Sequence, residues 1–342
     1  MIRIRFTDFW DSFDPENNFV LDILRTRYEV VQTGRPEFLF CSVFGHEHLQ
    51  HDCVRICLIC ENTAPDFNGS DYAVGMNDLQ FGDRYLRCLL NIAAPENPAA
   101  LQAVGDKHLR AEAGMKTKDG FCSFVYSNSW CSAPQRMELL EAIRSVEHVD
   151  CGGSIENNIG GKVADKVAFE AHHKFSIACE NSSQPGYCTE KLQESFAACT
   201  VPIYWGDPDA ARIYNEDAFI DCGRFADFGA VATEVARING DEGLYRRMLL
   251  QPAFAPGFDP LEHRRRLEDY LLYIVGQGPE KAFRRCRWGW AKPHADLERN
   301  VHRLDALLTN HFRTGQVVCR AGERLSKLMD GKAVREVKKL LK

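Results

Sequence analysis

The chain has 342 residues, of which 45% are hydrophobic, and a formal net charge of −6 at pH 7. That length suits about two domains of roughly 150 residues, each with a sizeable core. The acidic balance argues against a protein that binds nucleic acid. The first residues carry acids without the apolar stretch of a secretory signal, and no apolar run of the sequence is long enough to span a membrane.

The sequence contains 14 cysteines, and most of them lie inside apolar runs, as Cys57, Cys60, Cys179 and Cys199 do. A disulfide framework is typical of short secreted chains, and this chain is neither short nor visibly secreted. Buried free thiols behave as small hydrophobic groups. We therefore expect free cysteines and a location in the reducing cytoplasm.

The first third of the chain alternates strand-like apolar runs with helical and polar segments. Such alternation favours βαβ units and a parallel sheet. Residues 105–120 are polar, charged and interrupted by glycine, which predicts a linker. The predicted elements are strands at 1–6, 38–44 and 54–60 and helices at 22–28 and 83–91.

The rest of the chain repeats this alternation and then becomes mainly helical. A Gly- and Asn-rich loop is expected at 150–161. The predicted elements are strands at 121–128, 175–179 and 201–205 and helices at 134–146, 189–199, 230–239, 260–275 and 294–312.

The segment 174–206 predicts a strand, a polar loop, a helix and a second strand. In open α/β sheets, ligands bind beyond the carboxyl ends of the strands, and a helix N-terminus there favours an anion. Lys191 lies in the first turn of the predicted helix, where acidic residues are usually preferred. A bound pyrophosphate would explain a lysine at that position.

Five stretches of sequence together resemble the glycosyltransferases of family 10, the α-1,3/4-fucosyltransferases, and within them the bacterial enzymes of the Helicobacter type. They follow the family's order and spacing between about residues 56 and 228. The stretches are CENTAPDFNGSDYAVGMNDLQFGDRYLR at 60–87, GFCSFVYSNSWCSAPQRMELLEAI at 120–143, GGSIENNIGGKVADK at 152–166, HKFSIACENSSQPGYCTEKL at 173–192 and TVPIYWGDP at 200–208.

The resemblance implies an α/β protein with the GT-B fold, in which two Rossmann-like domains face a cleft. Residues 1–112 would form the N-terminal domain that holds the acceptor sugar, and residues 118–312 the domain that binds the donor, GDP-fucose. The family transfers fucose with inversion and has no catalytic metal in this site, so we expect no cofactor. The acceptor would be a GlcNAc-containing glycan.

Glu61 follows the apolar run 54–60, so it lies where a parallel strand ends. By itself, such a glutamate is more often a solvated carboxylate. The resemblance matches Glu61 to the family's general base, which would take the proton of the acceptor hydroxyl. A well-placed base of this kind contributes about 10²- to 10⁴-fold in rate.

The resemblance also implies the donor site. Arg136 and Lys191 match the family's pyrophosphate-binding pair, and two cations suit the charge that develops on the leaving diphosphate. Glu190 matches a carboxylate that binds the ribose hydroxyls, and Tyr187 matches a tyrosine on the nucleotide side. Asn181, with Glu180 and Asn128 as weaker candidates, lies at a strand end near the donor hydroxyls.

Two patterns that suggest metal sites are set aside. The first is a histidine- and cysteine-rich stretch at 46–60, where Cys57 and Cys60 would point to opposite faces of a strand. The second is Asp207-Pro208-Asp209, whose central proline after Trp205-Gly206 predicts a turn.

The C-terminal residues 320–342 carry eight basic and three acidic side chains together with an apolar stripe. A basic amphipathic helix of this kind can lie on an anionic membrane, which would place the protein at the inner face of the cytoplasmic membrane. The alternative is a solvated terminal helix that packs its stripe on the protein. Both interpretations remain open.

The leading hypothesis is transfer of L-fucose from GDP-fucose to GlcNAc in a lactosamine-type acceptor, with an α-1,3 linkage favoured over α-1,4. One alternative is transfer of another sugar from a GDP or UDP donor. The other is a non-catalytic module that binds a nucleotide sugar or a glycan, which retention of Glu61 disfavours.

Overall fold

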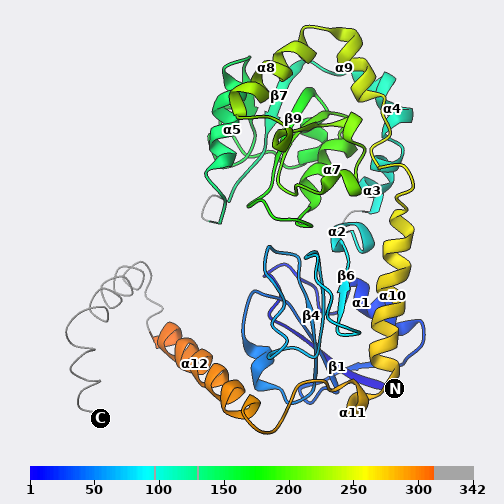
Figure 1. The fold of residues 1–342 in the computed structure, drawn as a ribbon, viewed down its shortest axis with the longest axis vertical. Coiled ribbons are helices and arrows are strands. Elements are labelled where there is room, and N and C mark those ends of the chain that lie inside the picture. Colours follow the sequence, from blue (N-terminus) through cyan, green and yellow to red (C-terminus); the bar gives the residue numbers. More distant parts are fainter. Residues whose placement is uncertain (96–97, 129–130, 312–342) are drawn as a thin grey trace, which may run out of the picture. The chain divides into compact units, whose positions relative to one another are not determined.

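A computed structural model of the chain describes residues 1–95, 98–128 and 131–311 (Figure 1). It divides into two compact units. The larger unit comprises Met1–His48 and Cys53–Arg284 and contains two parallel sheets. The smaller unit comprises Leu49–Asp52 and the chain from Arg285 onward, and its described part includes helix α12, Ala291–His311.

The N-terminal sheet has six strands within the described residues, in the order β2-β1-β3-β4-β5-β6. All of its neighbouring strands pair in parallel. Its central strands are fully buried, as expected for a sheet with helices on both faces. The predicted strands at 1–6, 38–44 and 54–60 are confirmed. The strands are β1 Ile2–Thr7, β2 Val30–Gln32, β3 Phe38–Cys41, β4 Val54–Leu58, β5 Tyr72–Gly75 and β6 Tyr85–Arg87.

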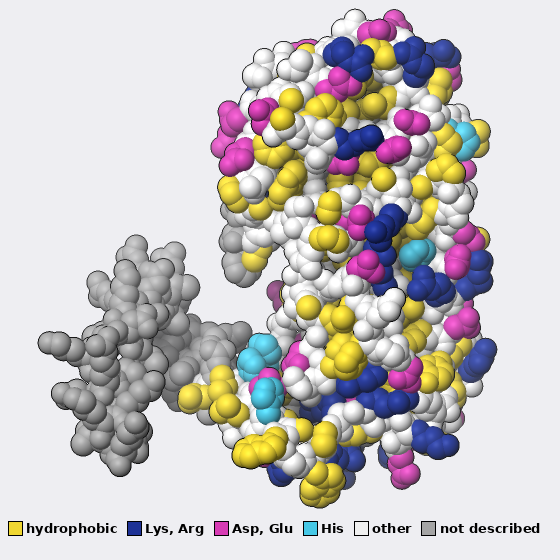
Figure 2. Space-filling view, viewed as in Figure 1, with side chains coloured by type: hydrophobic (Ala, Val, Ile, Leu, Met, Phe, Trp, Pro, Cys, Tyr) yellow, Lys and Arg dark blue, Asp and Glu magenta, His cyan; other side chains and the backbone are white. Residues whose placement is uncertain are grey.

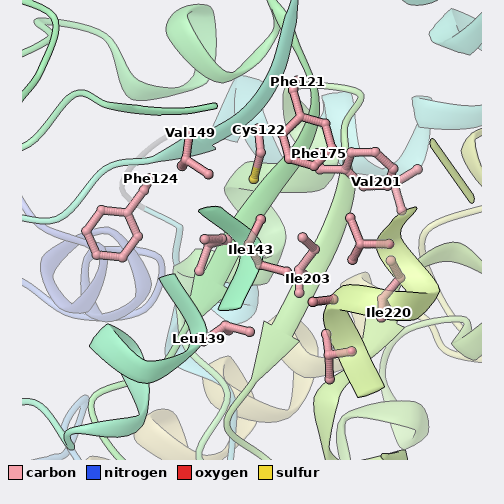
Figure 3. Close-up of a cluster of buried hydrophobic side chains, with 14 of the residues drawn as sticks. Phe121, Cys122, Phe124, Leu139, Ile143, Val149, Phe175, Val201, Ile203 and Ile220 are labelled. Carbon is pink, nitrogen blue, oxygen red and sulfur yellow. The ribbon is translucent and has the colours of Figure 1, made fainter. Parts of the chain in front are cut away.

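The second sheet has five strands in the described part of the chain, in the order β11-β10-β9-β7-β8, again all parallel. Figure 3 shows its core, where Phe175 and Ile203 on the strands meet Ile143 of helix α5. The predicted strands at 121–128, 175–179 and 201–205 are confirmed. The strands are β7 Gly120–Phe124, β8 Val149–Cys151, β9 His173–Cys179, β10 Val201–Trp205 and β11 Ile220–Asp221.

The helices of the larger unit connect the strands and cover the sheets. Six helix predictions are confirmed in position, at α1, α5, α7, α8, α10 and α12. The helices are α1 Phe19–Arg25, α2 Leu90–Ala93, α3 Pro98–Gly105, α4 Lys107–Met115, α5 Gln135–Arg144, α6 Lys166–Glu170, α7 Glu190–Ala197, α8 Phe228–Asn239, α9 Glu242–Leu249, α10 Pro260–Gly276 and α11 Pro279–Ala282.

Two predictions were wrong. The predicted helix at 83–91 begins instead as strand β6, because Tyr85 is buried and pairs with Ala73 at the edge of the sheet. The predicted linker at 105–120 is largely helix α4. The Lys107 side chain is buried and its ammonium donates to the carbonyl oxygens of Leu249 and Gln251, at 2.8 and 3.1 Å. A lysine that looks solvent-exposed in the sequence therefore fixes this segment to the second sheet's domain.

Helix α10 returns to the N-terminal sheet after the second sheet is complete (Figure 1). Its buried stripe of Leu267, Leu271 and Ile274 lies in one hydrophobic cluster with Ile4 and Val20. The sequence division placed residues 260–275 in the C-terminal domain, so the packing differs from that division. The reason is that an i, i+4, i+7 stripe predicts a helix without identifying the surface that buries it.

Within the described residues, every cysteine is a free thiol. No described helix is long and apolar enough to cross a membrane. The predicted basic tail at 320–342 lies outside the residues that the structure describes. On the face shown in Figure 2, basic and acidic side chains are interspersed, which agrees with the net charge of −6.

Candidate active site

The second sheet reverses its strand order between β7 and β9, since the chain continues from β7 to β8 on one side and to β9 on the other. A topological switch point of this kind creates a crevice at the carboxyl ends of the strands, where ligands bind in open α/β sheets. The end of β9 leads to Glu180 and Asn181, and the end of β7 leads to Asn128. The predicted donor-site residues therefore gather where topology alone would place a ligand.

Arg136 joins these two strand ends. It lies near the start of α5, and its side chain is buried. The guanidinium donates from Nη1 to the Asn128 carbonyl at 3.1 Å, and from Nη2 to the Cys179 carbonyl at 3.2 Å and to Asn181 Oδ1 at 2.6 Å. It also lies 4.3 Å from the ring centroid of Tyr126, a cation–π distance. Its Nε is buried and has no hydrogen-bond partner among the described residues.

Glu180 organises the loop that precedes helix α7. Its carboxylate is fully buried and accepts from the Thr189 backbone N–H at 2.8 Å and from the Thr189 hydroxyl at 2.6 Å. Thr189 occupies the N-cap position of α7, but its hydroxyl donates to Glu180 instead of accepting from the helix. Burial raises the pKa of Glu180, and the Lys191 ammonium opposes this effect.

Lys191 is held between carboxylates. Its ammonium lies 3.1 Å from Glu180 Oε2 and 3.1 Å from Glu190 Oε1, and it donates to Thr189 Oγ1 at 2.8 Å. Burial by itself lowers the pKa of Lys191, but the carboxylates of Glu180 and Glu190 raise it above its ordinary value. Lys191 therefore stays charged across the whole physiological range, and an incoming diphosphate would have to compete with Glu180 and Glu190 for it.

Glu190 is the first residue of α7, and its side chain is about half exposed, at 52%. Desolvation raises the pKa of Glu190, but the Lys191 ammonium and the backbone N–H of Glu190 itself lower it by more, so that the net shift is downward. Glu190 is thus an anionic, accessible hydrogen-bond acceptor beside Lys191. This is the chemistry that binding of vicinal hydroxyls requires.

Tyr187 connects the two predicted halves of the site. Its side chain is 2% exposed, and its hydroxyl donates to Glu61 Oε2 over 3.2 Å. Burial, followed by the carboxylates of Glu180 and Glu61, raises the pKa of Tyr187, so that the phenol remains a donor. Glu61 lies three residues beyond the end of β4, at the carboxyl edge of the N-terminal sheet. Close by, Asn62 Nδ2 donates to Ser182 Oγ.

Gly186 allows the loop that carries Tyr187 to lie close to the backbone at Met76. Its φ of +89° is in the left-handed region, and a Cβ at this position would lie 2.4 Å from the Met76 carbonyl oxygen. The Gly186 N–H donates to Asp207 Oδ1 at 2.8 Å, and the same oxygen accepts from the Asp209 N–H. The Asp207-Pro208-Asp209 triplet therefore forms the turn that its central proline predicts, and it positions the loop that carries Tyr187.

Sequence reasoning underestimated Glu180, which was a minor candidate, and it missed Tyr126. The Tyr126 hydroxyl donates to the Ile177 carbonyl at 2.9 Å and accepts from the Cys179 N–H at 2.6 Å, so it supports the end of β9. The aromatic residue two positions after a strand was the available signal. Among the described residues, no three His, Cys, Asp or Glu side chains form a group that could hold a metal ion.

These features define a class of protein. Two parallel α/β sheets, each with polar side chains at the carboxyl ends of its strands, form the GT-B fold of glycosyltransferases. Residues 4–93 match the family model described as "Alpha-(1,3)-fucosyltransferase FucT N-terminal domain", and residues 115–250 match "Glycosyltransferase family 10 (fucosyltransferase) C-term". The chain belongs to glycosyltransferase family 10, the fucosyltransferase family.

Individual relatives agree with this assignment. The chain is 28% identical over 287 residues to Alpha-(1,3)-fucosyltransferase FucT of Helicobacter pylori, a match that covers 73% of this chain and 60% of the relative. Thus the chain spans less than two thirds of that curated relative. A crystal structure of an alpha1,3-fucosyltransferase with GDP-fucose is similar with a TM-score of 0.64 and 25% identity, covering 79% of this chain and 90% of that one. The corresponding structure with GDP has a TM-score of 0.63, 27% identity and the same coverage.

Proposed function

We propose that this protein transfers L-fucose from GDP-fucose to a GlcNAc residue of a lactosamine-type glycan, forming an α-1,3 linkage in preference to α-1,4. The observation that carries the proposal is the 3.2 Å hydrogen bond between Tyr187 and Glu61. It places the candidate base from the N-terminal sheet against the loop that leads to Glu190 and Lys191. This contact supports the proposal that the base and the diphosphate site flank one reacting sugar.

In the proposed reaction, Glu61 accepts the proton of the acceptor hydroxyl while that oxygen attacks C1 of fucose. The C1–O bond to the β-phosphate breaks, and its electron pair leaves with GDP. Attack from the face opposite the leaving group inverts the anomeric centre. A carboxylate acting in this way is a general base, and its effect depends on hydrogen-bond reach to the hydroxyl.

We propose that cationic side chains, without a resident metal or cofactor, stabilise the leaving diphosphate. The Lys191 ammonium is already charged and preorganised by Glu180 and Glu190. Arg136 is engaged by strand-end acceptors through both Nη atoms, so we assign it a positioning role at the donor site. Its positive charge would also favour the diphosphate, and its buried Nε–H has no partner among the described residues. Asn181 is oriented by the same guanidinium, and Glu190 is proposed to bind the ribose.

The test is incubation of the purified protein with GDP-fucose and N-acetyllactosamine. We expect one GDP to be released for each fucosylated product, and mass spectrometry should identify the linkage of that product. Transfer of a different sugar from a panel of GDP- and UDP-sugars, with release of GDP or UDP, would favour a different donor specificity. Tight GDP binding without turnover on any donor would favour a non-catalytic binding module.

We further propose that the protein works in the reducing cytoplasm, since its described cysteines are free thiols and most are buried. Peripheral contact with an anionic membrane through 320–342 is a separate proposal that rests on the sequence alone. Deletion of that segment should abolish cosedimentation with anionic liposomes, and unchanged binding would dismiss the membrane role.

A further inference from the structure

The N-terminal sheet has a switch point of its own. The chain leaves β1 to form β2 on one side and β3 on the other, so the strand order reverses between β1 and β3. By the same topological rule that locates the donor site, a crevice for a ligand is expected at the carboxyl ends of these two strands. The proposed base Glu61 follows β4, the next strand along the same edge.

Two aromatic side chains occupy this switch point. Trp10 lies three residues beyond the end of β1, and Phe44 lies three residues beyond the end of β3, just as Glu61 lies three residues beyond β4. The register pairs Thr7 with Cys41 in the neighbouring strand. Cys41 is in turn paired with Cys57 of β4, so the loops that carry Trp10, Phe44 and Glu61 leave three successive strands, about 4.8 Å apart, at one edge of the sheet.

The loops that carry the aromatic pair are fixed to each other by Asp8. One carboxylate oxygen accepts from the Glu47 N–H at 2.9 Å, and the other accepts from the His48 N–H at 2.8 Å and contacts His48 Nδ1 at 2.7 Å. The Phe44 N–H donates to the Asp8 carbonyl at 3.1 Å. Asp8 has a φ of +61°, a strained conformation of the kind that clusters at ligand sites.

The aromatic pair packs against further rings, and half of Phe44 is exposed. The rings of Trp10 and Phe44 lie 6.1 Å apart in an edge arrangement, and Trp10 also packs against Phe13 at 5.5 Å. Phe13 in turn stacks on Phe9 at 3.9 Å. Phe44 nevertheless remains 50% exposed. A half-exposed aromatic ring that packs on other rings and has polar neighbours is typical of a binding surface, because ligand sites combine aromatic walls with a few polar groups.

We propose that Trp10 and Phe44 form an aromatic platform for the acceptor, on which the galactose ring next to the fucosylated GlcNAc packs its apolar face. The inference rests on the proposed function, since Glu61 marks where the reacting GlcNAc hydroxyl lies. A sugar linked to that GlcNAc and extending along the sheet edge reaches β3 and then β1. The platform would therefore select disaccharide acceptors over the monosaccharide.

The experiment compares kcat/KM for N-acetyllactosamine with kcat/KM for GlcNAc, at saturating GDP-fucose, in wild type and in Phe44→Ala and Trp10→Ala. We expect the disaccharide-to-monosaccharide ratio to fall about tenfold in each variant, the scale of one lost aromatic contact. Phe44→Tyr keeps the ring face and should keep the ratio. Leu109→Ala removes a side chain that is 72% exposed on α4 and should leave the ratio unchanged.

An unchanged ratio in Phe44→Ala and Trp10→Ala, with wild type active on both acceptors, would overturn the platform and leave the proposed function standing. Absence of transfer by wild type to either acceptor would overturn the proposed function instead. Phe44→Leu covers the case in which Phe44→Ala fails to fold, since leucine retains apolar volume without a ring face. A retained ratio in Phe44→Leu would also contradict the proposal.

Discussion

The hydroxyl of Tyr187 donates a hydrogen bond to Glu61 Oε2 over 3.2 Å, although 126 positions separate the two residues in the sequence. One residue belongs to the loop before α7, and the other follows β4. The bond fixes the orientation of Glu61, the candidate base, relative to the loop that precedes α7. Its loss should affect transfer more than folding, because a general base acts only within hydrogen-bond reach of the hydroxyl, whereas the half-buried Glu61 can exchange this bond for one to water.

Tyr187→Phe should therefore lower kcat by about tenfold while GDP affinity and melting temperature change little. Steady-state kinetics with saturating acceptor measures the effect, and calorimetry measures GDP binding. Since the phenylalanine ring fills the same buried space, a large drop in melting temperature would contradict a role limited to orienting Glu61.

Glu61→Gln removes the proposed base and keeps its shape. Transfer should fall about 10²- to 10⁴-fold, because glutamine cannot accept the hydroxyl proton. GDP affinity should remain, since the nucleotide is proposed to contact the second sheet's domain. Product formation by mass spectrometry and GDP binding by calorimetry together check this prediction. Turnover equal to wild type would exclude Glu61 as the base.

Lys191→Met should weaken GDP-fucose binding and also destabilise the fold. Without the ammonium, the fully buried Glu180 carboxylate loses its charge partner, and breaking a buried pair on one side costs about 3–5 kcal/mol. The double variant Lys191→Met with Glu180→Gln should recover stability without recovering donor affinity. Denaturant unfolding and GDP titration separate the two effects. Normal GDP-fucose affinity in the single variant would remove Lys191 from the donor site.

Gly186→Ala should reduce transfer strongly, because the new Cβ would lie 2.4 Å from the backbone oxygen of Met76 and would displace the loop that carries Tyr187. Gly160→Ala is the matched control. Gly160 also has a positive φ, +85°, but an added Cβ there meets nothing within 4 Å. Both variants carry backbone strain of order 1 kcal/mol, and only Gly186→Ala adds the clash. Equal activities of the two variants would show that the close contact between Gly186 and the Met76 backbone does not matter for transfer.

Glu170 gives a pH dependence of stability. Its carboxylate is buried in α6, its two oxygens accept no hydrogen bond from the described residues, and burial raises its pKa to about 7 against the attraction of Lys166. Because the pKa of Glu170 is higher in the folded state, its neutral form contributes to the folding free energy. That contribution is fully present below about pH 4.5 and is lost as pH rises through 7.

Between pH 5 and pH 8, wild type should therefore lose up to about 3 kcal/mol of folding free energy through this group. Glu170→Gln should lack that component, so its unfolding free energy should exceed wild type at pH 8 and approach it at pH 5. Urea unfolding at both values measures the difference. A gap between the two proteins that does not change with pH would show that Glu170 stays in one protonation state.

The local pattern of the sequence predicted much of the fold. Strands β3, β4, β9 and β10 are short and mostly apolar runs, and a parallel sheet buried on both faces requires such runs. Leu192 and Phe196 of α7 are fully buried, at the i, i+4 spacing of an apolar helix face. Cys199, which continues this spacing in the sequence, is also buried but lies beyond the end of α7, with a φ of +53°. Placing Glu61 and Asn181 at the carboxyl ends of strands needed no contact between distant residues.

Tertiary structure decided what these local patterns leave open. Helix α10 has an apolar stripe that would fit either sheet, and it packs against the first. Lys107 looks like a surface charge in the sequence but is buried against residues far along the chain, and Glu180, a weaker donor-site candidate in the sequence, is fully buried against Thr189. The proximity of Tyr187 to Glu61, and of Trp10 to Phe44, follows from strand order and loop closure. Periodicity shows which face of an element is apolar, whereas its neighbour is chosen by the packing of the whole chain, because apolar burial is non-directional.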